Sequence, residues 1–555
     1  MDFKQKIIEI LQKATNQKEI EIEIPPDSSM GDYAFPCFSL AKVYKKNPAD
    51  IAKELKDKIN EEGIIDRIEV KGPYLNFFVN KNKIVEDTIK KIIKEKDKYG
   101  SSNVGKGKKA LIEHTSINPN ASPHVGRARN ALIGDSITGL LKFQGYKVET
   151  HYFVNDVGKQ IAMLVLGCKG KKNLKFNDLL KIYININKKI EEKPELEKDV
   201  FDLLHKLEQK DKKVVDEFKK VVNICVKGQI GILSELGIEY DKFDYESDYL
   251  WKELTKDVLK KLEKTGKLFT DEEGRLVLDQ KEYSLSMKSP VLVLTRADKT
   301  SLYPLRDMAY TIDKINKGFH KNIIVLGEDQ KLYFQQLKAG LNLLGYEAPE
   351  VIHYSFVLLA EGKMSTRKGN LVLLEDFMKE ALDKAKEEIK KRHDKTDEKA
   401  ARKIAYGAIK YSVLRVSPEK NVVFDWQQAL NFEGDSGPYL QYAYVRINSV
   451  LEKYGKKVDE KADFSLLKQK EETELIKKLS AFPAVIEDAT KQLKTHLIAS
   501  YLTELSQLFS NFYHSCQILK EEENLKKARL LLAYCTKQVL ANGLNLLGID
   551  VLERM

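Results

Sequence analysis

The chain has 555 residues, of which 42% are hydrophobic and 32% charged, so it is too long for one hydrophobic core and should form about two to four domains. Its apolar runs are too short to cross a bilayer, and its charged N-terminal segment is unlike a signal peptide, so we expect no membrane partner and a cytoplasmic location. The net charge of +11 suggests a polyanionic partner, although a lysine-rich composition alone would produce it. The five cysteines include no CxxC pair, which argues against a disulfide framework and a zinc knuckle.

The first 109 residues are predicted to form a small domain and a basic linker. In residues 1–80, an amphipathic helix around Ile7 and Leu11, a helix beginning at Pro48 and a closing strand over 74–79 predict an α+β domain. Residues 81–109 follow as a basic helix and a glycine-containing linker, with ten lysines against four acidic residues. This run is either a solvated helix face or a contact for nucleic acid.

Residues 110–375 have the pattern of a parallel, doubly wound α/β sheet. A strand at 110–113, a turn rich in Asn, Pro and Ser, a helix from Val125 to about Gly145 and a strand at 148–154 form a β-α-β unit. Residues 162–280 are mostly charged and helical, which predicts a helical insertion. Strand patterns return at 290–294 and 323–326. Beyond 376 the hydrophobic period is helical, which predicts connecting helices over 376–430 and an all-α domain over 431–555.

A histidine-containing motif lies where the first strand of this unit turns into its helix. Residues 122–127 have the sequence Ser-Pro-His-Val-Gly-Arg. A helix N-terminus offers free amide donors and the positive end of its dipole to phosphate. Gly126 permits close approach of a nucleotide, and His124 can stabilise charge that develops at a phosphorus. The alternative is a proline-initiated helix with an incidental histidine.

A strongly basic segment follows about 240 residues later. Residues 363–369 have the sequence Lys-Met-Ser-Thr-Arg-Lys-Gly, so three cations lie within seven residues. A loop of this kind can close over a triphosphate and neutralise departing pyrophosphate. Taken alone, the segment could also be an exposed basic turn.

Together the two motifs resemble the signatures of class I aminoacyl-tRNA synthetases, and their surroundings resemble the arginyl-tRNA synthetase family. The matching catalytic positions are Glu113, Asn118, residues 155–160, the Tyr-x-x-Arg-Asp pattern from Tyr303 to Asp307, Gln330 and residues 364–369. Residues 26–33 and 72–77 resemble the family's additional N-terminal domain, which binds the tRNA elbow. Residues 437–446 and 546–555 resemble its helical anticodon-binding domain. The resemblance implies a multidomain protein with an α/β Rossmann-like class I core, a helical insertion, a small α+β N-terminal domain and an all-α C-terminal domain.

The resemblance also implies an arginine–tRNA ligase, commonly a monomer, that activates L-arginine with ATP and Mg²⁺ and transfers it to the 3′ end of tRNA(Arg). The family usually needs bound tRNA before it activates the amino acid. The implied ATP-binding residues are Pro123, His124, Val125, Gly126, Lys363, Met364 and Ser365. The implied catalytic residues are His124, Gly126, Arg127, Lys363, Ser365 and Lys368. The implied arginine-binding residues are Glu113, Asn118, His124, Tyr303, Asp307 and Gln330.

The residue types suit that substrate. A guanidinium is planar and permanently charged, so it calls for carboxylates and fixed acceptors, which Glu113 and Asp307 would supply. Asp307 could instead form an ion pair with the adjacent Arg306. No protein ligand can be assigned to Mg²⁺ and no other metal site is expected.

The catalytic cations depart from the family pattern. The usual second histidine of the first signature is Arg127 here, and the usual second lysine of the second signature is Thr366. Many arginyl enzymes carry a compensating lysine three residues before the first histidine, and this chain has Ala121 there. We hypothesise that Arg127 and Lys368 supply the missing charge. The alternative is that Lys363 and Arg367 suffice.

Two other functions stay open on the sequence alone. One is a class I aminoacyl-tRNA synthetase for another amino acid, and the other is a catalytically inert tRNA-binding paralogue. In the C-terminal region, aromatic residues are candidates for stacking on anticodon bases, with core packing as the alternative role. These candidates are Tyr439, Tyr442, Tyr444 and Tyr501.

Overall fold

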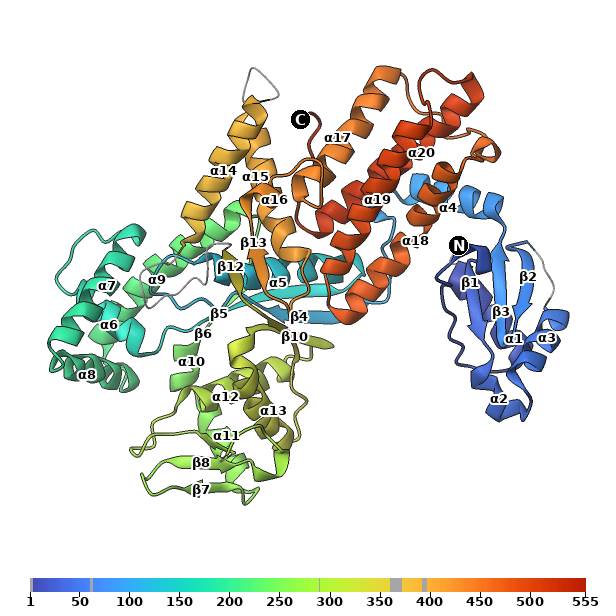
Figure 1. The fold of residues 1–555 in the computed structure, drawn as a ribbon. Coiled ribbons are helices and arrows are strands. Elements are labelled where there is room, and N and C mark those ends of the chain that lie inside the picture. Colours follow the sequence, from blue (N-terminus) through green and yellow to red (C-terminus); the bar gives the residue numbers. More distant parts are fainter. Residues whose placement is uncertain (1–2, 60–62, 289, 360–371, 392–396) are drawn as a thin grey trace.

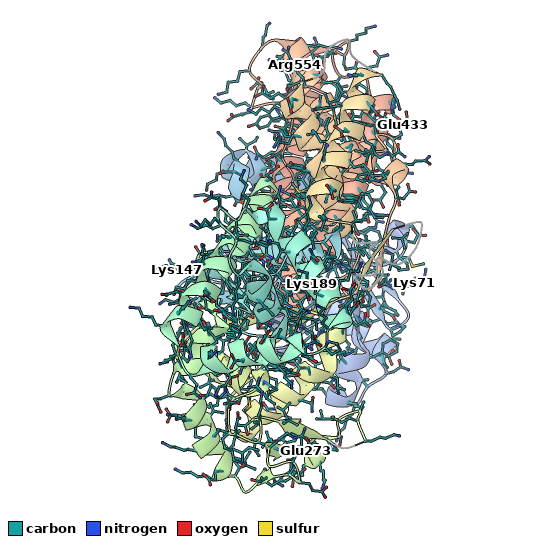
Figure 2. All side chains as sticks on the ribbon, turned by 90° about the vertical axis from the view of Figure 1, so that its left-hand side faces the viewer. Lys71, Lys147, Lys189, Glu273, Glu433 and Arg554 are labelled. Carbon is teal, nitrogen blue, oxygen red and sulfur yellow. The ribbon has the colours of Figure 1, made fainter. Side chains whose placement is uncertain are left out.

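The computed structural model describes residues 3–59, 63–288, 290–359, 372–391 and 397–555. The molecule is elongated (Figure 1), with a parallel sheet in its middle, the C-terminal helices on one side of this sheet and the N-terminal domain beside those helices. In the side view of Figure 2, Glu433 and Arg554 mark the helical end of the molecule, and Glu273 marks the opposite end.

A five-stranded parallel sheet forms the centre, as the sequence predicts. Its order is β11-β10-β4-β5-β6, with β4 (Lys109–Glu113), β5 (Lys147–Val154), β6 (Lys242–Tyr245), β10 (Lys321–Gly327) and β11 (Glu350–Tyr354). Helix α5 (Val125–Phe143) connects β4 to β5. Because β5 and β10 lie on opposite sides of β4, the strand order reverses here. Such a switch point leaves a crevice at the carboxyl ends of the strands.

The structure corrects the prediction that residues 162–280 form one helical insertion. The first part is helical, in α6 (Lys159–Cys168), α7 (Phe176–Glu192), α8 (Leu196–Glu208) and α9 (Lys212–Glu235). The chain then joins the central sheet as β6, an edge strand too short and polar to give a strand pattern. After α10 (Glu246–Trp251) and α11 (Leu254–Glu263), a separate antiparallel sheet contains β7 (Leu268–Thr270), β8 (Leu276–Asp279) and β9 (Val291–Val293). The strand expected at 290–294 therefore belongs to this second sheet.

Two helices that flank β10 in the sequence cover the face of the central sheet opposite α5. They are α12 (Tyr303–Asn316) and α13 (Lys331–Leu343). Successive side chains of β10 point to opposite faces. Ile323 and Val325 pack in the large core that contains α5, whereas Ile324 and Leu326 pack against the core formed by α12 and α13. The two faces of the sheet thus belong to two separate cores.

The C-terminal third is mostly helical. The predicted all-α domain contains α17 (Gly437–Tyr454), α18 (Lys470–Gln492), α19 (His496–Ser515) and α20 (Glu523–Leu546). The connecting segment contains α14 (Leu374–Lys390), α15 (Glu398–Leu414) and α16 (Trp426–Ala429), but it also contributes β13 (Val422–Phe424), which pairs with β12 (Val357–Leu359). The expectation of helix throughout is wrong at this strand, because three residues that pair with a distant partner carry no local pattern. Ser136 of α5 donates to Leu546 O at 2.8 Å, so the sheet and the helices share one core.

The N-terminal domain is the predicted small α+β unit. Its antiparallel sheet has the order β1-β3-β2, with β1 (Tyr33–Pro36), β2 (Ile65–Lys71) and β3 (Tyr74–Val79). The helices of this domain are α1 (Phe3–Thr15), α2 (Phe38–Tyr44) and α3 (Pro48–Lys58). Pro48 opens α3, and Asn47 caps it by accepting from the Ala49 amide at 2.9 Å.

The predicted basic linker is docked on the C-terminal helices. Helix α4 (Lys81–Glu95) packs against α18 and α20. Just after α4, Asn542 Nδ2 donates to Lys96 O at 2.9 Å and to Tyr99 O at 3.1 Å. The N-terminal and C-terminal domains are therefore joined side by side, although the catalytic region separates them in sequence (Figure 1).

In the part of the chain that the structure describes, no helix is long and apolar enough to cross a membrane. The same residues contain no group of three or more His, Cys, Asp or Glu side chains placed to hold a metal ion. All five cysteines are buried free thiols.

Candidate active site

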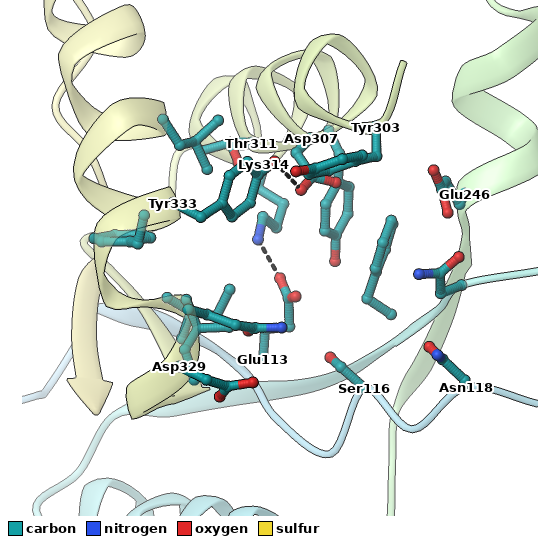
Figure 3. Close-up of a pocket in the computed structure, with 18 of the residues that line it drawn as sticks. Glu113, Ser116, Asn118, Glu246, Tyr303, Asp307, Thr311, Lys314, Asp329 and Tyr333 are labelled. Carbon is teal, nitrogen blue, oxygen red and sulfur yellow. Dashed lines mark hydrogen bonds and ion pairs between the residues drawn. The ribbon is translucent and has the colours of Figure 1, made fainter. Parts of the chain in front are cut away.

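A cavity of about 450 Å³ opens at the carboxyl ends of the central strands. Residues that end or follow four neighbouring strands line one side, namely Glu113 on β4, Asn155 after β5, Glu246 after β6 and Gln330 after β10. The helices α12 and α13 supply the opposite wall (Figure 3), with Tyr303, Asp307, Tyr310, Lys314 and Tyr333. The size and the place both suit a small-molecule site in an open α/β sheet.

The backbone between β4 and α5 is held in an uncommon conformation. Thr115 and Ser116 have φ values of 79° and 41°, in a region that costs a residue other than glycine roughly 1–3 kcal/mol. The Thr115 amide donates to Asn130 Oδ1 at 2.5 Å, and the Thr115 hydroxyl lies 2.6 Å from the Tyr240 hydroxyl. These bonds offset the strain and turn the chain so that Ser116 and Asn118 line the cavity.

Gln229 of α9 fastens the same loop and is fully buried. Its Nε2 donates to Asn118 O at 3.0 Å and to Ala121 O at 2.8 Å, while its Oε1 accepts from the Tyr152 hydroxyl at 2.8 Å. The helices of residues 159–235 therefore contribute directly to the loop that carries Asn118 and His124.

His124 lies at the N-cap position of α5, where the sequence predicts it. The backbone around it pairs with the chain that follows the basic segment 363–369. Val125 N donates to Val372 O at 3.2 Å, and Leu374 N donates to Pro123 O at 2.8 Å. The two signature motifs are thus linked through the residues that follow the second one.

The first turn of α5 is crowded around the imidazole. A Cβ atom at position 126 would lie 3.1 Å from His124 Nδ1, so the glycine leaves room for the ring. Burial, together with the positive charge of Arg127, lowers the pKa of His124 to about 4. The imidazole is therefore neutral at physiological pH, with one N–H donor. Arg127 lines the cavity itself.

Two carboxylates of the cavity are already paired within the protein. Glu113 forms an ion pair with Lys314, and both side chains are buried, at 4% and 1% exposed. Glu246 accepts from Arg306 Nε at 2.7 Å, so the ion pair of Arg306 is with Glu246 and not with Asp307. Burial raises the pKa of Glu246 to about 7.

Asp307 keeps its carboxylate available to a ligand. Its Oδ2 accepts from the Tyr333 hydroxyl at 2.5 Å, and in the described part of the chain it has no salt-bridge partner. Burial raises its pKa to about 6, against the opposing effects of the Tyr333 bond and the charge of Arg306. A bound cation would favour the ionised form of this group.

The other expected arginine-binding residues reach the same cavity, except His124. Asn118 is held by Gln160, whose Oε1 accepts from Asn118 Nδ2 at 3.1 Å. Tyr303 begins α12, is 53% exposed and has its ring centroid 5.1 Å from that of Tyr333, so it lies at the mouth of the cavity. His124 lies beside the cavity at the helix N-terminus but is not among its lining residues.

Some predicted site residues lie outside the described part of the chain, and some residues that line the cavity were not predicted. Four predicted residues of the second motif lie outside the described residues, namely Lys363, Met364, Ser365 and Lys368. Glu246 was not predicted because β6 gave no strand pattern. Tyr310, Tyr333 and Lys314 were not predicted either, although Lys314 follows Asp307 by seven positions and so lies on the same helix face, a spacing that could have identified it.

Three family models match the chain and together cover nearly all of it. "Arginyl tRNA synthetase N terminal domain" matches residues 1–79, "tRNA synthetases class I (R), catalytic domain" matches 88–426, and "DALR anticodon binding domain" matches 440–555. The fold and the site therefore define a class I aminoacyl-tRNA synthetase.

Full-length relatives narrow this class. The chain is 41% identical to the arginine–tRNA ligase of Methanocaldococcus jannaschii and 36% identical to that of Halothermothrix orenii, over 100% of both chains in each case. The solved Thermus thermophilus arginyl-tRNA synthetase has a similar fold, with a TM-score of 0.87, 26% identity and full coverage of both chains. The chain belongs to the arginyl-tRNA synthetase family, and the resemblance found in the sequence is confirmed.

Proposed function

We propose that this protein is an arginine–tRNA ligase that works in two steps. A carboxylate oxygen of L-arginine attacks the α-phosphorus of ATP, pyrophosphate leaves and arginyl-adenylate forms. A hydroxyl of the terminal adenosine of tRNA(Arg) then attacks the arginyl carbonyl carbon, and AMP leaves. The observation that carries the proposal is the Asp307 carboxylate in the cavity wall, which suits a permanently charged side chain. The names of the full-length relatives support the same assignment.

The arginine substrate would lie across the cavity. Its guanidinium would reach Asp307 and Glu113, which lie on opposite walls, so that its several N–H donors meet two acceptors. Asn118 and Gln330 would orient the other end of the molecule, and Tyr303 would cover the mouth. A lysine substrate has fewer N–H donors and would leave some of these acceptors unpaired, which is costly in a buried site. The enzyme can therefore discriminate arginine from lysine without a separate editing site.

ATP would bind beside this cavity at the N-terminus of α5. The neutral imidazole of His124 would donate to a phosphate oxygen, and Gly126 leaves the space for it. Arg127, with Lys363, Ser365 and Lys368 of the second motif, would balance the charge of the triphosphate. Mg²⁺ enters as MgATP, held by phosphate oxygens.

ATP–pyrophosphate exchange, with and without tRNA, tests the proposal. We expect exchange with arginine, not with lysine, and only when tRNA is present. Asp307→Asn should raise the KM for arginine about 10- to 150-fold, because a charge-assisted hydrogen bond is worth about 1.5–3 kcal/mol. Asp202→Asn is the matched control, because the Asp202 side chain lies on the exposed face of α8, away from the cavity. Exchange with a different amino acid would indicate another class I synthetase. No exchange with any amino acid, either with or without tRNA, would indicate an inert paralogue.

We propose that a second cavity, in the C-terminal helices, binds an anticodon base of tRNA. It measures about 520 Å³ and is lined by Tyr442, Arg446, Lys453 and Tyr513, among others. The guanidinium carbon of Arg446 lies 4.7 Å from the Tyr442 ring centroid and 5.5 Å from that of Tyr513. Aromatic and guanidinium planes suit unstacked bases. Tyr501, by contrast, is buried and donates to Lys478 O at 2.7 Å, so it belongs to the core.

Because one chain carries both cavities, we propose the monomer as the working form. The cytoplasm, where tRNA is charged for translation, is the proposed location. Both are expectations that solution scattering of the purified protein and fractionation of cells would test.

A further inference from the structure

Lys314 is a buried cation that the proposed reaction does not use. It lies on α12 with its side chain 1% exposed, and its ammonium group points to the Glu113 carboxylate (Figure 3). The same Nζ lies 4.1 Å from the centroid of the Tyr310 ring. Lysine is rarely so buried, and burying a charge is unfavourable unless it is well paired. A lysine in this position therefore calls for a reason connected with the cavity.

Among the described residues, four carboxylates line the cavity, and they are in unequal states. Glu113 is paired with Lys314 and Glu246 with Arg306. Asp329 lies at the exposed rim, where water screens its charge. Only Asp307 is both set into the wall and held by a neutral partner, Tyr333. Arg127 also lines the cavity, at the first turn of α5 beside the proposed ATP site. Apart from Arg127, the described residues of the inner cavity thus present about one net negative charge to a ligand.

We propose that Lys314 is a positioning residue that sets the charge of the substrate pocket. By pairing with Glu113, it leaves one uncompensated carboxylate, Asp307, to match the single positive charge of an arginine side chain. Glu113 stays fixed as a neutralised acceptor for the remaining guanidinium donors. This inference rests on the proposed function and concerns how the same cavity binds its substrate.

The alternative arrangement explains why such a lysine is useful. Without the ammonium group, Glu113 and Asp307 would be two like charges in one cavity, and one of them would take up a proton near neutral pH. The charge of Glu113 raises the pKa of Asp307, and the charge of Lys314 lowers it. The other groups that bear on Asp307 are Arg306 and Tyr333, with Tyr303 on the same helix and Glu246 on α10. Removing the Lys314 charge therefore raises the pKa of Asp307 for two reasons. The lowering effect of Lys314 itself is lost, and the raising effect of Glu113 is no longer compensated.

The test compares Lys314→Met, which keeps the length of the side chain, with Lys314→Arg, which keeps its charge. Arginine binding needs ionised Asp307, so it is strong above the pKa of Asp307 and is lost as pH falls through that pKa. For Lys314→Met, we expect the KM for arginine in tRNA-dependent exchange to rise about fivefold at pH 6 and about twofold at pH 7, as when the pKa of Asp307 rises from about 6 to about 7. The rise should disappear at about pH 8.5, with kcat nearly unchanged. Lys314→Arg should behave like the wild type.

A third variant separates charge from structural damage. In Lys314→Met combined with Glu113→Gln, both members of the pair become neutral with little change of shape, and replacing both partners costs far less than removing one. We expect the pH dependence of KM to return to that of the wild type, while KM itself stays higher at every pH because the Glu113 carboxylate no longer accepts from the guanidinium. Arg529→Met, which breaks an equally buried pair with Glu472 in the C-terminal helices, should lower stability and leave this profile unchanged.

An unchanged pH profile in Lys314→Met, or a double variant whose KM keeps the shifted pH profile of the single one, would overturn the role of Lys314 while the proposed function stands. Absence of arginine-dependent exchange in the wild type would overturn both. If Lys314→Met does not fold, the role of Lys314 is tested with the double variant and with Lys314→Arg. A raised KM with a shifted pH profile in Lys314→Arg would then overturn the inference, because the charge is retained there.

Discussion

His124 and Arg127 lie on the first turn of α5, where the family signature usually has two histidines. The imidazole is neutral, because burial and the neighbouring guanidinium lower its pKa to about 4. It can therefore donate a hydrogen bond without carrying charge, while Arg127 carries a permanent charge and lines the cavity. This division of roles motivates the proposal that Arg127 stands in for the missing signature cation, next to the reacting carboxylate and phosphate.

Replacing Arg127 by alanine should slow arginyl-adenylate formation far more than it weakens arginine binding. A preorganised charge that faces developing charge contributes about 10²- to 10³-fold in rate, and we expect a loss of this size in single-turnover measurements of adenylate formation. Isothermal titration with arginine should give a Kd within a few-fold of the wild type. Arg127→Lys, which keeps the charge, is the matched control. A nearly normal rate in Arg127→Ala would mean that Lys363 and Arg367 suffice.

Helix α9 positions the active-site loop although it belongs to a region without any signature motif. Its Gln229 bonds two carbonyl groups of the loop, at Asn118 and Ala121, and is itself held by Tyr152. The loop carries two strained residues, Thr115 and Ser116, and would relax to commoner backbone angles without such bonds. The helices of residues 159–235 thus contribute to the geometry of catalysis.

The variant Gln229→Met tests this role of α9. It fills a similar volume but removes the Gln229 hydrogen bonds to the Asn118 and Ala121 carbonyl groups, worth about 0.5–1.5 kcal/mol each. The Asn118 carbonyl then keeps only the Asn120 amide, at 2.8 Å, and the Ala121 carbonyl keeps only the Cys225 thiol, at 3.6 Å. We expect kcat/KM for exchange to fall about tenfold or more, because a small misplacement of Asn118 and His124 is costly in rate. Gln441→Met removes a comparably buried glutamine that bonds two carbonyl groups, at Lys403 and Asp550. Equal loss of stability with equal loss of activity in the two variants would contradict the positioning role.

At the scale of the whole molecule, the catalytic and C-terminal regions are packed as one body. Helix α5 begins directly after its N-cap residue His124 and contacts α15, α18 and α20 along its length. Asp135, one residue before the Ser136 contact with α20, is half-buried near Lys410, which donates to Gly548 O. A tRNA held at the C-terminal cavity would therefore be held rigidly relative to the catalytic cavity.

Arg446→Met should separate recognition of tRNA from recognition of arginine. Loss of the stacked guanidinium should raise the KM for tRNA(Arg) in aminoacylation about 5- to 150-fold, since stacking on a base is worth about 1–3 kcal/mol. The Kd for arginine should not change. Arg402→Met provides the matched control, because Arg402 also lies over a tyrosine ring, that of Tyr406, away from both cavities. An equal rise of the KM for tRNA in both variants would argue against a specific base site.

Local patterns predicted the parts of the fold that are local. The β-α-β unit of residues 110–154, the helix at Pro48 and the C-terminal helices follow from periodicity and from proline or glycine punctuation. The short strands β6 and β13 were missed, and β9 was expected in the wrong sheet. Strands of three or four residues are defined by the partner with which they pair, and a one-dimensional pattern does not contain the partner.

The features of the active site also divide into those that the sequence predicts and those that depend on distant partners in the folded chain. The sequence by itself determined the family and, through the resemblance to it, six residues that line the cavity, namely Glu113, Asn118, Arg127, Tyr303, Asp307 and Gln330, because the family's motifs keep recognisable spacings along the chain. Only the tertiary structure decided that Glu113 is paired with Lys314, 201 positions away, and that Gln229 holds the loop from 111 positions away. Such contacts depend on how helices pack over the sheet, so the charge of the cavity and the rigidity of its loop are properties of the folded chain.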